Sequence, residues 1–212
     1  MSSEFTVCVT GASGFIAGQT IRELLANGFR VRGTVRGDVD DSQYAYLKQL
    51  PGAAERLRLV PGDLTQPGSF DTAIAGCDYV IHAASPYLLE TKNPQQEMVD
   101  PAVDGTLDVL RACAHASSVK RVVLTSSLAA ITDEPDDRHV FTETDWNSKS
   151  SLARNPYFYS KALAEQAAWN FMREQTRSFD LVALNPCMVI GEAVGSGLNS
   201  SNQVIRDLLS GT

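Results

Sequence analysis

Residues 5–37 read FTVCVTGASGFIAGQTIRELLANGFRVRGTVRG, and this stretch predicts a strand, a tight turn, a helix and a second strand. β-branched residues form short apolar runs over 5–10 and 30–35, which are the two expected strands. Between them apolar residues recur at helical spacing from Phe15 to Leu25, and Gly28 ends the helix. The order of these elements is that of a βαβ unit.

The turn of this unit, TGASGFIAG, places Gly11 and Gly14 where the strand gives way to the helix. Backbone N–H groups and the helix N-terminus can face a pyrophosphate there. Ala17 stands where a third glycine is usual, a position that serves helix-to-strand packing and not phosphate contact. A plain tight turn is the alternative, but the context within a βαβ unit favours a dinucleotide site.

The rest of the chain continues the alternation of strands and helices. Further strands are predicted over residues 57–60, 79–82, 121–124 and 181–184. Helices are predicted over 42–50, 69–74, 101–116 and 162–172, and irregular chain over 135–146 and 191–202. Six alternating strands indicate an α/β fold with a doubly wound parallel sheet of the Rossmann type, because each crossover must pack a helix on one face. No repeat or internal boundary divides the 212 residues, so we expect one domain.

Composition excludes several classes of protein. The chain is 43% hydrophobic and 20% charged, which is ordinary for a globular protein. Its net charge of −7 does not favour a nucleic-acid or anionic-membrane partner, since both need a basic surface. No apolar run is long enough to span a bilayer, and the first residues do not resemble a signal peptide, so a cytoplasmic location is expected.

Cysteine and histidine spacing indicates no metal site and no disulfide framework. The cysteines form no CxxC pair, and we interpret all of them as small core residues. They are Cys8, Cys77, Cys113 and Cys187. The histidines are dispersed, and His82, at the end of an apolar strand, is expected to be a hydrogen-bonded core residue.

Arg36 follows the second strand, where a doubly wound domain distinguishes NAD from NADP. A guanidinium there can form two hydrogen bonds with the 2′-phosphate, so NADP is favoured. The alternative is a solvated surface charge, and Asp38, Asp40 and Asp41 would weaken its field. Asp63, after the third strand, is a candidate acceptor for the adenine amine.

Tyr157 and Lys161 are spaced i, i+4 and would share one face of a helix. A phenol with an ordinary pKa near 10 is a poor acid catalyst at pH 7 until a nearby cation lowers that pKa, and Lys161 can supply the cation. Ser127 follows the fifth strand, at the sheet edge where the crevice of this fold opens. A YxxxK pair alone is usually surface helix, but the glycine turn and strand-end serine favour a catalytic interpretation.

Taken together, the motifs resemble those of an extended short-chain dehydrogenase/reductase, in the group of dihydroflavonol reductases, cinnamoyl-CoA reductases and microbial aldehyde/ketone reductases. The matching segments are VTGASGFIAG, GTVRG, GDLTQPGSFDTAIAGCDYVIHAASP, VDGTLDVLRAC, KRVVLTSSLAAI, YFYSKALAEQAAW and NPCMVIG, in order over nearly the whole chain.

The resemblance implies a catalytic triad of Ser127, Tyr157 and Lys161. Tyr157 would protonate the carbonyl oxygen as hydride arrives, and Lys161 would bind the nicotinamide ribose and lower the tyrosine pKa. The implied NADP contacts are Gly11, Ser13, Gly14, Phe15 and Ile16 for the pyrophosphate, Arg36 for the 2′-phosphate, Asp63 and Leu64 for the adenine, Ala83, Ala84 and Ser85 for the ribose, Pro186 to Val189 for the nicotinamide, and Ser201 for a cofactor phosphate.

The chain departs from this group at three points. The residues after Arg36 are acidic where a second basic residue is frequent, which weakens the expected NADP selectivity. Asp108 stands where asparagine is common, which would change a structural or water-relay contact. Members of the group also run well beyond the point that matches Thr212, so the C-terminal substrate-binding part is expected to be missing from this chain.

The sequence therefore predicts an NADPH-dependent reductase of aldehyde or ketone carbonyls. A sugar-nucleotide epimerase or dehydratase and a non-catalytic NADP-binding regulatory protein are the alternatives. The expected partners are a small-molecule carbonyl substrate and either a second copy of the chain or a segment that completes the substrate site.

Overall fold

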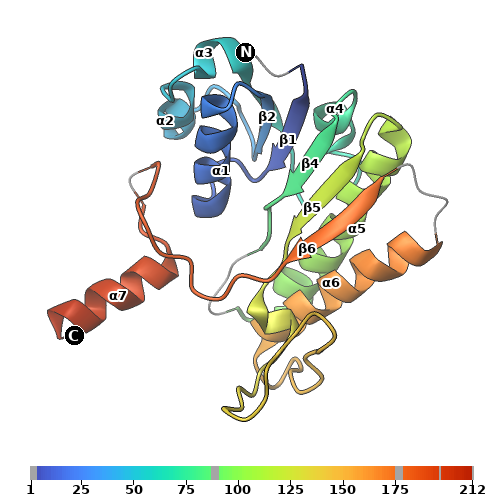
Figure 1. The fold of residues 1–212 in the computed structure, drawn as a ribbon, viewed down its shortest axis with the longest axis vertical. Coiled ribbons are helices and arrows are strands. Elements are labelled where there is room, and N and C mark those ends of the chain that lie inside the picture. The colour runs from blue at the N-terminus through green and yellow to red at the C-terminus, as the bar shows by residue number, and fades with distance from the viewer. Residues whose placement is uncertain (1–3, 87–90, 175–178, 196, 212) are drawn as a thin grey trace.

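Six parallel strands form a single sheet in the computed structural model, which describes residues 4–86, 91–174, 179–195 and 197–211 (Figure 1). The strands are β1 (Thr6–Thr10), β2 (Arg30–Val35), β3 (Leu57–Pro61), β4 (Tyr79–His82), β5 (Arg121–Thr125) and β6 (Asp180–Leu184). Their order is β3-β2-β1-β4-β5-β6, and every neighbouring pair is parallel. The predicted doubly wound α/β fold is confirmed.

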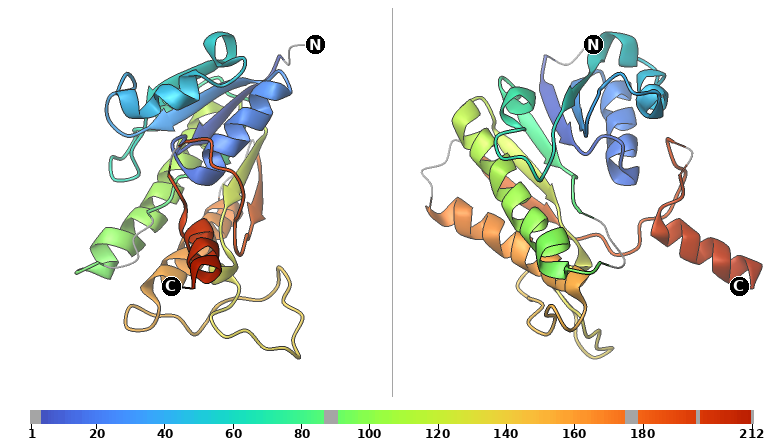
Figure 2. Two further views of the ribbon diagram at one scale, coloured as in Figure 1. Left: turned by 90° about the vertical axis from the view of Figure 1, so that its left-hand side faces the viewer. Right: turned by 180° about the vertical axis from the view of Figure 1, so that it is seen from behind.

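Helices connect the strands and cover the sheet. They are α1 (Phe15–Ala26), α2 (Ala45–Lys48), α3 (Ala53–Arg56), α4 (Asp71–Ile74), α5 (Asp100–Ala116), α6 (Pro156–Glu174) and α7 (Ser200–Ser210). Shorter turns of helix are η1 (Ser42–Tyr44), η2 (Gln95–Val99) and η3 (Leu128–Ala130). Figure 2 shows α5 and α6 together over one face of the sheet, and α1 against the other.

Two apolar cores lie on the two faces of the sheet. Successive side chains of a strand point to opposite faces, so Val7 and Val9 pack with α1 whereas Cys8 packs with α4, α5 and α6. Because helices cover both faces of much of the sheet, the strands read as continuous apolar runs. This is why the sequence shows them clearly.

The crevice of the fold opens where the direction of winding reverses. β1 lies between β2 and β4, and Thr10 is in register with His82. Ligands in open parallel sheets bind at such a switch point, beyond the carboxyl ends of the strands. The glycine turn after β1 and the segment after β4 therefore face the same opening.

Several helix boundaries differ from the predictions. Residues 42–50 form η1 and α2 in succession, and α4 begins at Asp71. α6 begins at Pro156, earlier than predicted, because its first five residues, PYFYS, include no strong helix former. α7 begins inside the stretch predicted to be irregular, since the Asn199 side chain caps it by accepting from Asn202 N at 2.8 Å. α3 and η2 were not predicted.

Three of the cysteines are buried, as predicted, but Cys187 is exposed, so its assignment to the core was wrong. Cys187 follows β6, which is an edge strand of the sheet. Within those residues no cluster of His, Cys, Asp or Glu is arranged to hold a metal ion. No described helix is both long enough and apolar enough to cross a bilayer.

Candidate active site

Gly11 shapes the turn after β1. Its φ is +67°, and a Cβ at this position would lie 2.9 Å from the Ala84 Cα, closer than real Cβ contacts allow. Gly11 N donates to the Thr34 hydroxyl at 3.0 Å, and Gly14 N donates to Gly11 O at 2.8 Å. Only glycine fits here, because it lets the turn after β1 pack directly against the Ala84 backbone.

The N-terminus of α1 points into this opening with no side chain capping it. Gly14 is the N-cap residue, no described side chain accepts from the first turn, and that turn carries no acidic residue. The first N–H groups of a helix have no acceptor within the helix, and its dipole favours an anion at this end. The backbone around Ser13, Phe15 and Ile16 therefore suits the pyrophosphate predicted for it.

Thr10 links the two strands that border the crevice, a role that the sequence analysis missed. Its buried hydroxyl oxygen accepts from Ala83 N at 3.1 Å and Ala84 N at 3.0 Å, and lies 2.7 Å from His82 Nδ1. With two donors already on the oxygen, the hydroxyl hydrogen is left for Nδ1, which assigns the Nε2–H tautomer to His82. Burial, with a smaller effect of the Lys161 charge, lowers the pKa of His82 to about 3, so this histidine is neutral.

A cavity of about 380 Å³ extends from the glycine turn across the ends of β1, β2 and β4. The structure brings together here nine of the residues predicted to bind the cofactor, namely Gly11, Ser13, Gly14, Arg36, Asp63, Leu64, Ala83, Ala84 and Ser85. Thr34, Glu97 and Pro101 also line it and were not predicted. The cavity has the place and extent expected for the adenosine half of a dinucleotide.

The remaining predicted cofactor residues lie outside this cavity. Phe15, Ile16 and Val189 line a neighbouring cavity of about 580 Å³ between α1 and the chain after β6. Pro186 follows β6, where its carbonyl accepts from Leu128 N at 3.0 Å. Ser201 is on α7, which extends away from the sheet (Figure 1) and lines none of these cavities. Its phosphate contact remains a prediction.

The acidic residues after Arg36 are engaged with other partners. Asp40 forms an ion pair with Lys48 at 2.7 Å, Asp41 caps η1 by accepting from Gln43 N, and Asp38 accepts from Asp40 N. Arg36 is exposed at the cavity, and its carbonyl accepts from the Tyr44 hydroxyl at 2.7 Å. Lys48 thus offsets the charge of Asp40, whereas Asp38 and Asp41 accept from backbone N–H groups and keep their charge.

Ser127 precedes η3, and Tyr157 and Lys161 lie in the first two turns of α6. Lys161 Nζ lies 5.6 Å from the centroid of the Tyr157 ring and donates to Ser85 Oγ at 2.6 Å. The lysine is 8% exposed, and burial lowers its pKa to about 8. Ser127 follows β5 as the N-cap of η3, and its Oγ accepts from Ala129 N at 3.1 Å. Its hydroxyl hydrogen therefore remains to be donated outward.

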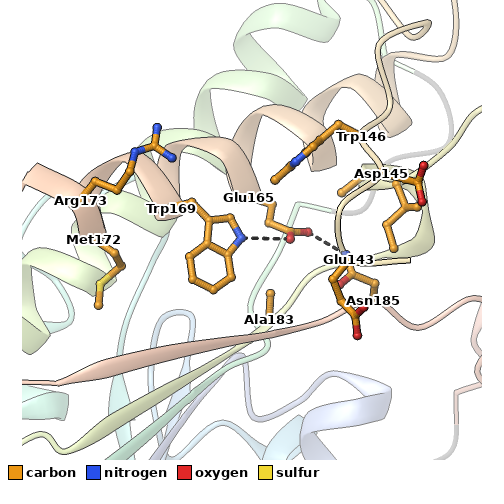
Figure 3. A pocket seen from close by; sticks show the side chains of 11 residues that line it. Glu143, Asp145, Trp146, Glu165, Trp169, Met172, Arg173, Ala183 and Asn185 are labelled. Carbon is orange, nitrogen blue, oxygen red and sulfur yellow. Dashed lines mark hydrogen bonds between the residues drawn. The ribbon is translucent and has the colours of Figure 1, made fainter. Parts of the chain in front are cut away.

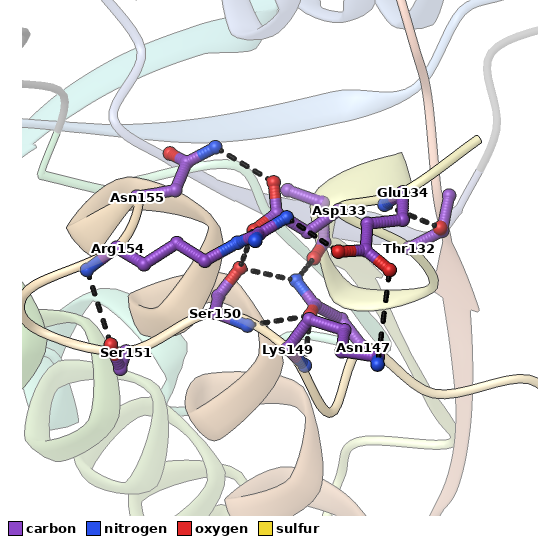
Figure 4. Close-up of polar contacts among 10 residues, drawn as sticks. Thr132, Asp133, Glu134, Asn147, Lys149, Ser150, Ser151, Arg154 and Asn155 are labelled. Carbon is purple, nitrogen blue, oxygen red and sulfur yellow. Dashed lines mark hydrogen bonds and ion pairs between the residues drawn. The ribbon is translucent and has the colours of Figure 1, made fainter.

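The loop that leads to Tyr157 is anchored at Asp133 (Figure 4). Its carboxylate forms an ion pair with Arg154 at 3.0 Å and accepts from Ser150 at 2.8 Å and Asn155 at 3.0 Å. Burial opposes ionisation of Asp133, but these hydrogen bonds outweigh it and lower its pKa. The network fixes the chain immediately before Pro156, where α6 begins.

Asp108, one of the departures from the expected motif, makes a structural contact. Its two carboxylate oxygens accept from Gly68 N at 2.9 and 3.1 Å, which joins α5 to the turn before α4. The amide oxygen of an asparagine side chain at this position could accept the same hydrogen bond from Gly68 N. The substitution therefore leaves the candidate site intact.

Comparison with known proteins relates this geometry to a family. The model described as "NAD dependent epimerase/dehydratase family" matches residues 7–211. Cinnamoyl-CoA reductase CAD2 of Medicago truncatula is 46% identical over 213 residues, covering 97% of this chain and 64% of the relative. A dihydroflavonol 4-reductase of Arabidopsis thaliana is 38% identical, covering 95% of this chain and 53% of the relative.

A solved structure with the same fold carries a cofactor. Gre2 of Candida albicans in complex with NADPH superposes with a TM-score of 0.87 at 33% identity, covering 97% of this chain and 65% of that one. This chain thus spans less than two thirds of the length of these relatives. The resemblance to the dihydroflavonol and cinnamoyl-CoA reductase group is confirmed.

Proposed function

Because the chain belongs to the NAD dependent epimerase/dehydratase family, we propose that it forms the NADP-binding and catalytic part of a reductase that converts aldehyde or ketone carbonyls to alcohols. The observation that carries the proposal is the buried Lys161, held between the Tyr157 ring and Ser85 at the crevice that the glycine turn also faces. A phenol beside a buried cation can act as a general acid at neutral pH.

The residues present fit NADP. Gly11 lets the turn pack against Ala84 at the cavity, the uncapped α1 N-terminus favours a phosphate, and Arg36 is exposed at the cavity for a 2′-phosphate. Asp63 and Leu64 are at the same cavity for the adenine, and Ala83 to Ser85 for a ribose. When bound, NADPH supplies the hydride.

Each catalytic side chain has a separate task in this proposal. Tyr157 donates a proton to the carbonyl oxygen, and Lys161 lowers the phenol pKa by its charge and binds the nicotinamide ribose. Ser127 donates a hydrogen bond to the same oxygen with the hydrogen that its contact with Ala129 N leaves available. Together they orient the substrate oxygen and neutralise its developing charge.

The names of the relatives favour reduction over the two alternatives. The cinnamoyl-CoA and dihydroflavonol relatives are reductases by name, which supports a reductase in preference to an epimerase or a binding protein. Since the chain spans less than two thirds of their length, the substrate and the activity of the whole protein are part of the proposal. We expect the 212 residues to bind NADPH but to reduce carbonyls weakly unless a further segment completes the substrate site.

A paired measurement tests this function. NADPH binding is titrated by fluorescence, and NADPH oxidation is followed with a panel of aldehydes and ketones, for the wild type and Tyr157→Phe. We expect the variant to bind NADPH normally and to lose about 10²- to 10⁴-fold in turnover. Near-normal turnover of the variant would refute the acid role of Tyr157. Binding with no oxidation of NADPH by any carbonyl would contradict the weak reduction expected of these residues.

A further inference from the structure

A buried carboxylate on α6 has no part in the proposed chemistry. Glu165 is 7% exposed and lies one helical turn beyond Lys161. Burying a carboxylate is costly unless hydrogen bonds satisfy it. The hydrogen-bond donors around Glu165 therefore indicate what this buried carboxylate contributes to the fold.

Three donors from three places in the fold converge on Glu165, and Figure 3 shows two of them, Trp169 and Asn185. Ser126 Oγ and Asn185 Nδ2 donate to Oε2, at 2.5 and 2.7 Å, and Trp169 Nε1 donates to Oε1 at 3.2 Å. Ser126 follows β5, Asn185 follows β6, and Trp169 is one turn further along α6. The carboxylate thus joins the ends of two strands to the helix that carries Tyr157 and Lys161.

The same contacts hold Ser127 from both sides. Ser126 precedes it directly, and Asn185 Nδ2 also donates to the Ser127 carbonyl at 3.1 Å. Main-chain bonds continue the connection, since Ser126 N donates to Leu184 O at 2.8 Å and Leu128 N donates to Pro186 O at 3.0 Å. Ser126 and Asn185, the two residues that flank Ser127 in this way, both donate to Glu165.

We propose that Glu165 is a positioning residue, which fixes the Ser127 hydroxyl relative to Tyr157 and Lys161 by bonding Ser126 and Asn185 to α6. The inference rests on the proposed function for its effect on turnover. Its structural part, the fixing of the segment around Ser127, is independent of that function. Reacting groups must be held within fractions of an ångström, and a misplacement of about 1 Å costs about 10²-fold in rate.

Glu165→Gln and Glu165→Leu separate positioning from general stability. Glutamate has two acceptor oxygens in its side chain, glutamine has one, and leucine has none. We expect kcat to fall about 10- to 100-fold, with the NADPH Kd changed less than about twofold because the glycine turn lies on other elements. Glu143→Gln removes an exposed carboxylate from the cavity that Glu165 also lines, and should leave kcat unchanged.

A double-mutant cycle identifies the residue through which Glu165 acts. In Ser127→Ala the hydroxyl to be positioned is gone, so adding Glu165→Gln should cost little further turnover. A full additive loss in that background would overturn the proposal, because Glu165 would then act elsewhere. A merely structural role would lower kcat equally in both backgrounds.

Hydrogen exchange decides the proposal even if no variant reduces a carbonyl. Glu165→Gln should raise exchange of amides 126–130 about tenfold or more and leave amides 11–18 unchanged. Unchanged exchange at 126–130 would overturn the positioning role. Absent turnover in the wild type would instead count against the proposed function alone.

Asn185→Ala tests the proposal if the Glu165 variants fail to fold. This change removes the donor shared by Glu165 and Ser127, so it should raise exchange of amides 126–130 in the same way. Unchanged exchange there would overturn the proposal.

Discussion

Lys161 donates a hydrogen bond to the Ser85 hydroxyl at 2.6 Å, although the two residues are 76 positions apart in the chain. The contact brings the helix that carries Tyr157 against the segment that follows β4. A hydroxyl satisfies one ammonium hydrogen but does not offset the charge. Burial therefore dominates, and lowers the pKa of Lys161 to about 8.

The first prediction is that Lys161 loses its proton near pH 8. A group whose folded pKa is lowered carries its charge below that pKa and is neutral above it, so the cation beside Tyr157 is present at pH 7 and disappears as pH rises through about 8. NMR titration of ¹³Cε-labelled lysines checks this. Lys120, whose pKa is raised by its hydrogen bond to Asp78, is the internal control. A Lys161 resonance that titrates with the exposed lysines would contradict the prediction.

Gly11→Ala should distort the glycine turn and weaken NADPH binding. The new methyl group meets the Ala84 backbone at 2.9 Å, and alanine at φ +67° costs about 1–2 kcal/mol in addition. We expect the NADPH Kd to rise at least about tenfold, measured by fluorescence titration. Gly76→Ala is the matched control, because its φ of +73° imposes the same backbone strain with no atom within 4 Å. Equal losses of affinity in both variants would show that backbone strain alone is responsible.

Arg36 should determine the preference for NADPH over NADH. Hydrogen bonds between charged groups contribute about 1.5–3 kcal/mol, which corresponds to about 10- to 150-fold in affinity. Arg36→Ala should therefore bind both cofactors about equally, whereas Arg58→Ala, an exposed arginine on β3, should keep the preference. Titration calorimetry with each cofactor measures this. Equal affinities in the wild type would refute the assignment.

Asp133 should stabilise the loop before α6 in a pH-dependent way. Its folded pKa is lowered below the unfolded value of about 4, so its contribution is complete above that pH and is lost as pH falls below it. Asp133→Asn should lower Tm by several degrees at pH 7, since each kcal/mol corresponds to about 2–4 °C in a chain of this size. The difference in Tm between Asp133→Asn and the wild type should become smaller below about pH 4.

Asp136→Asn is the control for this loop prediction. Asp136 pairs with Arg138 at 3.4 Å in the same loop, but the arginine is 91% exposed, and exposed pairs contribute little. Its Tm should match the wild type in scanning calorimetry at both pH values. A constant difference between the wild type and Asp133→Asn down to pH 3 would show that the carboxylate charge is not what stabilises the loop.

The sequence predicted the parts of this protein that local pattern determines. The strands and α1 followed from buried apolar runs and helical spacing, and the cavity residues followed from their positions after strands. Glu165 was missed because its partners Ser126 and Asn185 meet it only through the β5–β6 register, in which Val122 lies opposite Leu181. Thr10 was missed for the same reason, since its acceptor role depends on the register of β1 with β4.

The last prediction concerns the apolar surface at the β6 edge. Val182, Leu184 and Ile190 are 38%, 54% and 59% exposed, and on α7 Leu208 and Leu209 are 72% and 84% exposed. An open edge strand and exposed apolar side chains each favour association with another chain. We therefore expect the 212-residue chain to self-associate, with a mass above 22.9 kDa in light scattering.

Leu184→Lys should shift the chain toward the monomer, because a charge at the edge of a sheet opposes strand pairing. The same change at exposed Val140, in the loop before α6, should not. A wild-type monomer at all concentrations would show that the exposed side chains of β6 and α7 do not drive association.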